Sequence, residues 1–145
     1  MSTPSHLRPA LVGVVAIGGM AGTTLRYLLT TTVGSHAGFP TATFVENVVG
    51  AFLLGGLLEV LLRSGAEQRG GQLLRLGLGT GLLGGFTTFS ALALEVTVLL
   101  QDGRVGLAAG YAAGSLGLGV VACLLGVAAA ARWRLRRGTE GGTAR

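Results

Sequence analysis

The sequence predicts an all-α membrane protein with four transmembrane helices, because of its composition and its four long apolar segments. Half of the 145 residues are hydrophobic, 12% are charged, and the mean hydropathy is +0.66. Soluble domains usually carry about 25% charged residues, so we expect little of this surface to face water. A helix needs roughly 20 apolar residues to cross a bilayer. The segments are about 10–33, 41–62, 73–100 and 105–131, and they make the chain, 1–145, a single integral membrane domain.

Each segment supports a spanning helix in turn. The first carries one charged residue, Arg26, near its end, where a long side chain can reach the membrane interface. Glu59 in the second segment and Glu95 in the third are similarly expected near span ends. The fourth segment, residues 105–131, has no charge and no polar face. A soluble four-helix bundle needs a polar face on each helix, so the membrane interpretation is preferred.

The connectors between the segments leave no room for a folded domain outside the membrane. They are residues 35–40, 63–72 and 101–104. Any function must therefore lie within or between the helices. The chain has 27 glycines, many of them inside the segments. They predict helices in close contact, because small residues let backbones approach where lipid provides no hydrophobic drive.

The charged residues exclude several functions. All eleven basic residues are arginines, and with six acidic residues they give a net charge of +5. They flank the apolar segments, as residues that bind anionic headgroups do, and no interleaved aromatic residues indicate nucleic acid. Cys123 is the single cysteine, so no disulfide is expected. No nucleophile–base pair or cluster of metal ligands indicates catalysis, and we do not expect an enzyme.

The stretch GGFTTFS, residues 84–90, combines glycines with hydroxyl groups in the most apolar part of the third segment. Irregular backbone inside a membrane persists only where protein buries it or where it lines a cavity. Gly84 and Gly85 are predicted to release the helix and to turn carbonyl oxygens toward a cation. The hydroxyls and the ring edges of the phenylalanines suit a small anion. The alternative is that the hydroxyls bond to the preceding turn and the glycines only pack.

Asn47 is a polar side chain inside the second segment, where an unpaired amide is costly. Its amide could serve a binding site or make a hydrogen bond to a neighbouring helix. Glu46 is next to it, but adjacent helical residues point about 100° apart, so both cannot face one cavity. Only about five residues of the segment precede Glu46, so an interfacial position is expected for it.

Three stretches, GGMAGTTLRY, TFVENVVGAFLLG and GTGLLGGFTTFS, resemble at matching spacing the three signatures of the Fluc (CrcB) fluoride channel family. The resemblance covers the first three spans, and the fourth is compatible with it. It implies a channel that exports fluoride passively and so relieves its toxicity. It also implies an antiparallel, dual-topology dimer of four-helix subunits, with a broken third helix, two fluoride pores and a structural sodium ion at the dimer centre.

The same resemblance implies the site residues, position by position. Main-chain oxygens of Gly84 and Thr87 are expected to bind the sodium ion. The side chains expected to line the fluoride pore are Asn47, Phe89, Ser90, Tyr111 and Ser115. The chain departs from the family pattern TTFSTF, because Ala91 and Leu92 replace a threonine and the second phenylalanine. Leucine has no polarised ring edge, so one anion contact is missing.

The arginine distribution predicts a single orientation in the cell membrane. With four spans, the N-terminus, the 63–75 connector and the C-terminus share a side, which carries nine arginines against at most two on the other. The positive-inside bias then places both termini in the cytoplasm. Glu46 also stands where the family has a small or apolar residue. We therefore expect an oppositely oriented paralogue as the partner, with a homodimer as the alternative.

A small four-span multidrug-type, proton-coupled antiporter is the main alternative function. That mechanism needs a carboxylate inside the first span, which has none, although Glu46 could substitute. A non-transporting scaffold is a third interpretation. It would explain the packing glycines but would leave the GGFTTFS stretch without a reason.

Overall fold

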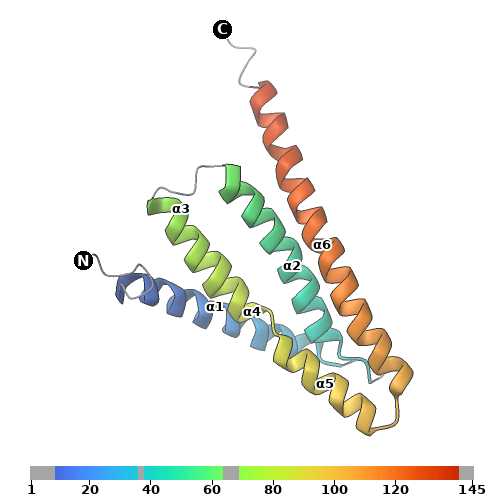
Figure 1. Ribbon diagram of the computed structural model, residues 1–145. Coiled ribbons are helices and arrows are strands. Elements are labelled where there is room, and N and C mark those ends of the chain that lie inside the picture. The colour runs from blue at the N-terminus through green and yellow to red at the C-terminus, as the bar shows by residue number, and fades with distance from the viewer. Residues whose placement is uncertain (1–8, 36–37, 64–68, 141–145) are drawn as a thin grey trace, which may run out of the picture.

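The described part of the chain is helical almost throughout in the computed structural model (Figure 1). The structure describes residues 9–35, 38–63 and 69–140, without the side chains of 63, 69 and 134–140. Most of the arginines that predict the orientation lie outside these described side chains. The elements are α1 (Pro9–Val33), α2 (Thr41–Arg63), α3 (Arg69–Leu74), the π-helix η2 (Arg75–Leu83), α4 (Gly84–Phe86), α5 (Phe89–Gln101) and α6 (Val105–Glu140).

Four helical stretches are long and apolar enough to cross a membrane, which confirms the prediction of an all-α fold with four spans. The third stretch combines α3, η2, α4 and α5. The last helix, α6, continues to Glu140, beyond the predicted end at 131. Helix extends past the apolar segment because four of the next nine residues are arginine, a good helix former.

Glycines with left-handed backbone end two of the helices. Gly34 (φ 60°) follows α1, and its N–H donates to the Thr30 carbonyl at 3.0 Å. Gly103 (φ 72°) lies between α5 and α6, and its N–H donates to the Leu100 carbonyl at 3.0 Å. Residues with a Cβ atom rarely adopt this conformation, so glycine allows the chain to reverse. The second turn lays α5 beside the start of α6 (Figure 1).

Two helix pairs pack backbone against backbone through glycine. A Cβ atom at Gly18 on α1 would collide with the carbonyl oxygen of Gly77 on η2. A Cβ atom at Gly55 on α2 would collide in the same way with the carbonyl oxygen of Cys123 on α6. Close approach of this kind is how helices associate in lipid, so the predicted packing role is confirmed for these glycines.

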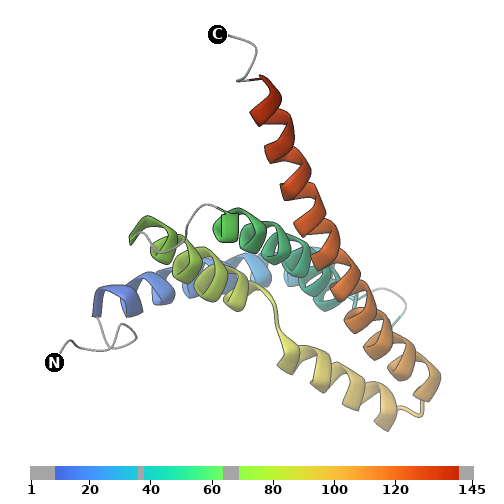
Figure 2. The same cartoon turned by 45° about the horizontal axis from the view of Figure 1, so that its top comes forward.

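The third span changes direction between α4 and α5, as Figure 2 shows. Thr87 (ψ 152°) and Thr88 (φ −148°, ψ 118°) have extended backbone, whereas Gly84 is helical (φ −65°, ψ −32°). The prediction that Gly84 and Gly85 release the helix is therefore wrong, because the helix continues through both of them. Gly85 has a packing reason instead: a Cβ atom there would lie 2.5 Å from the carbonyl oxygen of Gly19 on α1.

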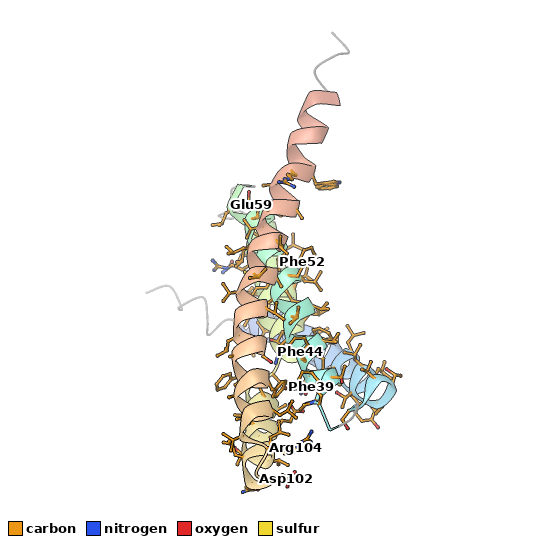
Figure 3. All side chains as sticks on the ribbon, turned by 90° about the vertical axis from the view of Figure 1, so that its right-hand side faces the viewer. Phe39, Phe44, Phe52, Glu59, Asp102 and Arg104 are labelled. Atoms are coloured by element: carbon orange, nitrogen blue, oxygen red, sulfur yellow. The ribbon has the colours of Figure 1, made fainter. Side chains whose placement is uncertain are left out.

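A small core lies between α5, α6 and the start of α2. Its buried members are Leu92, Leu99, Ala108 and Tyr111. Phe39 contacts both Phe44 and Tyr111 edge to face, with ring centroids 5.5 and 5.3 Å apart, and Figure 3 shows the two phenylalanines side by side. Leu92 is 6% exposed, so it packs where the family pattern has a phenylalanine.

Candidate ion-binding site

The site forms where α2 meets the extended residues between α4 and α5. The Asn47 side chain bridges the backbone of Thr88 with two hydrogen bonds. Thr88 N–H donates to Oδ1 of Asn47 at 2.8 Å, and Nδ2 donates to the Thr88 carbonyl at 3.0 Å. Extended backbone inside a bilayer cannot turn to water for these bonds. Asn47 therefore stabilises the interruption of the third span.

One N–H of Asn47 remains for a ligand. An asparagine amide carries two N–H donors, and the Thr88 carbonyl takes one. Asn47 also lines a groove between α5 and α6, where a ligand could reach the remaining donor. An interhelical bond and a binding contact, the two roles considered for this residue, are compatible with each other.

The interruption deprives two main-chain carbonyls of their usual donors. In a continuous helix, Thr88 N–H would donate to the Gly84 carbonyl, and Ala91 N–H to the Thr87 carbonyl. Thr88 N–H bonds to Asn47 instead, and Ala91 N–H donates to Oγ1 of Thr88 at 3.2 Å. The described residues hold no group of three or more His, Cys, Asp or Glu side chains that could bind a metal. A cation here would therefore use main-chain oxygens.

Two surface grooves adjoin the interruption and share Asn47 and Thr87. The carbonyl groove, of about 280 Å³, lies between α2 and the end of η2, and Gly84 is among its lining residues. The hydroxyl groove, of about 360 Å³, lies between α5 and α6. Its lining includes Asn47, Thr87, Thr88, Phe89, Ser115 and Cys123.

The helix ends at the interruption have opposite polarity. The end of α4 presents carbonyl oxygens, the negative end of a helix dipole, and the start of α5 presents N–H groups, the positive end. Thr88 caps α5 by accepting from Ala91, and Phe89, the first residue of α5, lines the hydroxyl groove. The carbonyl groove therefore suits a cation and the hydroxyl groove an anion. Sequence reasoning missed this contribution, although a threonine before an apolar run is an N-cap signal.

Ser115 supplies the one fully buried side-chain oxygen or nitrogen in the described residues that has no hydrogen-bond partner. Its side chain is 5% exposed and lines the hydroxyl groove. A buried hydroxyl without a partner is unfavourable, so a ligand that accepts its hydrogen would remove this cost. Ser115 therefore places a hydroxyl without a partner in the wall of the groove.

Phe89 and Ser90 begin α5 and are both exposed in the single chain. Phe89 lines the hydroxyl groove, yet 73% of the residue is accessible. Ser90 is not among the lining residues, and its Oγ lies 3.1 Å from Oγ1 of Thr88. Of the predicted pore residues, the groove thus gathers Asn47, Phe89 and Ser115.

Tyr111 lies one turn before Ser115 on α6, but its side chain is buried in the core. Its hydroxyl donates to Oε2 of Glu95 at 2.6 Å, and the hydroxyl of Thr43 donates to Oε1 of Glu95 at 2.7 Å. Glu95 therefore accepts two hydrogen bonds inside the protein. Its expected place near a span end did not indicate these bonds. The network joins α2, α5 and α6, and no sequence spacing could have revealed it.

Glu46 is 1% exposed, so other helices cover its side chain, while its expected depth at the membrane interface stays a prediction. Its Oε1 accepts a hydrogen bond from the hydroxyl of Thr30 on α1 at 2.7 Å. Glu59, expected near a span end, is also buried, with 8% exposure. Their burial depends on the other helices that cover α2, which the sequence of α2 alone does not describe.

The fold and the site define a small helical membrane protein whose interrupted helix lines mainly apolar grooves with a few polar groups, an arrangement found in channels and transporters. The chain belongs to the CrcB family: the family model described as CrcB-like protein, Camphor Resistance (CrcB), matches residues 13–127. This confirms the resemblance seen in the sequence.

Similar proteins include two fluoride-specific ion channels. The chain is 53% identical over 117 residues to the fluoride-specific ion channel FluC of Novosphingobium aromaticivorans, covering 78% of this chain and 90% of that protein. It is 42% identical over 139 residues to the fluoride-specific ion channel FluC 2 of Leifsonia xyli subsp. xyli, covering 96% of each. The similarity therefore extends over all four spans.

Proposed function

We propose that the chain forms a fluoride-selective channel that lets fluoride leave the cell passively and so relieves its toxicity. The names of the relatives support this function. The observation that carries it is the partnerless hydroxyl of Ser115 in a groove that also holds the spare N–H of Asn47 and the N-terminus of α5. Fluoride is small and strongly hydrated, so a path must replace its water with closely spaced donors. Within the described part of the chain, no carboxylate lines the groove to oppose an anion.

The path is proposed to be completed by a second, antiparallel subunit. The exposed ring of Phe89 and the position of both grooves at the surface support this, because a partner could cover them. Leu92 packs in the core of this chain, so a second ring edge would have to come from the partner. The one-sided distribution of arginines favours a paralogue over a second copy. Relatives whose names are numbered, FluC 2 and FluC 1, are consistent with paired genes.

The carbonyl groove is proposed to hold a structural sodium ion at the dimer centre. The oxygens of Gly84 and Thr87 fit this role, because each has lost its helical donor. The Thr87 hydroxyl already donates to the Leu83 carbonyl at 2.9 Å, so only the main chain is needed. The bound ion would supply positive charge that offsets the carbonyl dipoles.

Melting temperatures of the assembled protein test the sodium proposal. Replacing sodium with a large organic cation should lower the melting temperature of the wild type and of Thr87→Val by similar amounts. The proposal is refuted if sodium leaves the melting temperature of the wild type unchanged.

The antiporter alternative is not supported. The first span contains no aspartate or glutamate, and the family relatives are named as ion channels. Glu46, the substitute carboxylate, is buried and bonded to Thr30, outside the lining of either groove. A carrier carboxylate has to meet its substrate, and this one has no described route to it.

Fluoride efflux from liposomes tests the channel proposal directly. The purified chain, alone and together with any paralogue encoded beside it, is reconstituted in vesicles loaded with potassium fluoride, and a potassium ionophore removes the membrane potential. We expect fluoride release without nucleotide or proton gradient, and far slower release of chloride. Equal release of both halides, or no release from either preparation, would show that the proposed function is wrong.

A further inference from the structure

A third groove lies between α1 and the beginning of the third span, apart from the hydroxyl and carbonyl grooves. It has a volume of about 480 Å³, and we call it the α1–η2 groove. Five apolar side chains and two polar ones line it, and none of them lines the other two grooves. The lining residues are Leu11, Val12, Val15 and Ala16 of α1, Gln72 of α3, and Arg75 and Leu76 of η2.

The groove exists because α1 and the third span separate toward their N-terminal ends. At Gly18 the α1 backbone touches η2 at Gly77, where a side chain could not fit. Figures 1 and 2 both show the starts of α1 and α3 apart, and the two helical segments converge toward α4. The result is an apolar wedge that opens toward one end of the spans.

The polar end of the groove carries positive charge. Arg75 is exposed, and Gln72 lies one turn before it. Among the residues that the structure describes, no acidic side chain lines the groove to neutralise the guanidinium. Arg75 is also the last charged residue before the uncharged stretch 76–94, so its level along the third span is that of the headgroups. The side of the membrane that it shares with eight other arginines is the predicted cytoplasmic side, where anionic lipids are concentrated.

We propose that the α1–η2 groove binds an anionic phospholipid, with an acyl chain along the apolar wedge and the phosphate on Arg75 and Gln72. The shape, the apolar lining and the unopposed positive charge at the headgroup level each match one part of such a lipid. A second copy of the same groove does not fit as the occupant. In an antiparallel dimer, the copy of Arg75 lies at the opposite face of the membrane, so the two grooves cannot cover each other.

Native mass spectrometry of the detergent-purified, assembled protein tests the proposal with two lipids of identical acyl chains, a phosphatidylglycerol and a phosphatidylcholine. We expect retention of phosphatidylglycerol in preference to phosphatidylcholine. Arg75→Gln should reduce phosphatidylglycerol binding about fivefold, the contribution of one arginine near an anionic surface. The control, Arg132→Gln, removes an exposed arginine of α6 outside the groove and should leave binding unchanged. Ala16→Phe fills the apolar wedge and should abolish retention of both lipids.

Three results would overturn the proposal. Equal loss of binding in Arg75→Gln and Arg132→Gln would indicate only diffuse attraction to charge. Displacement of the lipid by soluble glycerol phosphate would indicate a phosphate site without an acyl chain. Conversion of the dimer to a monomer by Ala16→Phe would indicate that the groove is a subunit interface. None of these readouts involves fluoride flux, so the outcome is independent of the proposed channel function.

Discussion

Ser115 and Asn47 show how two polar residues of the same groove can have different relations to stability. The Ser115 hydroxyl has no partner in the described structure, whereas the Asn47 amide satisfies two backbone groups of Thr88. Removing a buried group without a partner relieves an unfavourable state, and removing a bonded group creates one. Variants at the two positions can therefore test the proposed role in conduction separately from a role in folding.

Ser115→Ala should reduce fluoride flux while leaving the protein as stable as the wild type or more stable. The hydroxyl makes no hydrogen bond in the described structure, so its loss should not weaken the fold, and an unsatisfied group of this kind costs about 1–3 kcal/mol. Liposome flux and the melting temperature in detergent measure the two effects. The control, Thr97→Ala, removes an exposed hydroxyl bonded to the Ala93 carbonyl on α5 and should change neither. Normal flux in Ser115→Ala would exclude this hydroxyl from the path.

Asn47→Ala should lower both flux and stability. The variant leaves the N–H and the carbonyl of Thr88 without partners, at a cost of about 1–3 kcal/mol for each group. Size-exclusion chromatography and thermal unfolding in detergent measure the loss of stability. The control is Val49→Ala, which changes a partly exposed side chain on the same helix. A variant with wild-type stability and reduced flux would mean that the bridge to Thr88 contributes nothing to the fold.

At the level of the helices, the third span combines tight packing with a short extended segment. Its first part, through η2 and α4, is fixed against α1 by glycine contacts such as Gly18 with Gly77 and Gly85 with Gly19. Its second part, α5, packs on α6. The two parts pack against different helices, and the extended residues between them allow the change of direction. Polar backbone groups face the grooves because the helix is interrupted between these two parts.

Gly85→Ala should destabilise the protein by about 1–3 kcal/mol, because the added methyl group would press on the carbonyl oxygen of Gly19 and force the helices apart. Gly13→Ala is the matched control, since a Cβ atom there meets nothing within 4 Å and alanine favours helix by up to about 1 kcal/mol. Thermal unfolding in detergent compares the two. Equal stability of both variants would contradict the proposed contact between α1 and α4.

At the scale of the whole molecule, the surface of the chain and its charge distribution both bear on the proposed assembly. The ring of Phe89 is largely exposed, and both grooves of the site lie at the surface. Nine of eleven arginines belong to one side of the predicted topology. A chain with a strong orientation preference cannot supply its own antiparallel partner, so the two properties together favour assembly with a different subunit.

Expression of this gene alone should therefore yield chains in one orientation, with both termini in the cytoplasm. In a Cys123→Ala background, Ser2→Cys and Thr143→Cys place a single thiol at either end. We expect a membrane-impermeant maleimide to label neither thiol in intact cells and both in opened cells. Labelling of half the molecules from outside, together with full fluoride flux, would establish a homodimer instead.

The sequence alone determined the class, the four spans and the residues around which the site is built. Its apolar segments exceed the length of a bilayer, and a helix is the one simple way for a single segment to satisfy its backbone in lipid. The stretch GGFTTFS and Asn47 were recognisable because polar groups in such surroundings are costly. These inferences rest on local composition, which does not depend on the neighbours of each helix.

Only the tertiary structure decided how the polar groups are used. The interruption lies at Thr87 and Thr88 and not at Gly84 and Gly85, because the helix continues through both glycines, Gly85 packs closely on α1, and Asn47 of α2 satisfies the extended backbone. The structure also showed that Glu46 is covered by other helices, which the sequence of α2 did not indicate. The physical reason is common to these cases: a hydrogen bond or a close contact between helices depends on residues far apart in the sequence, and no local pattern records which helix will supply the partner.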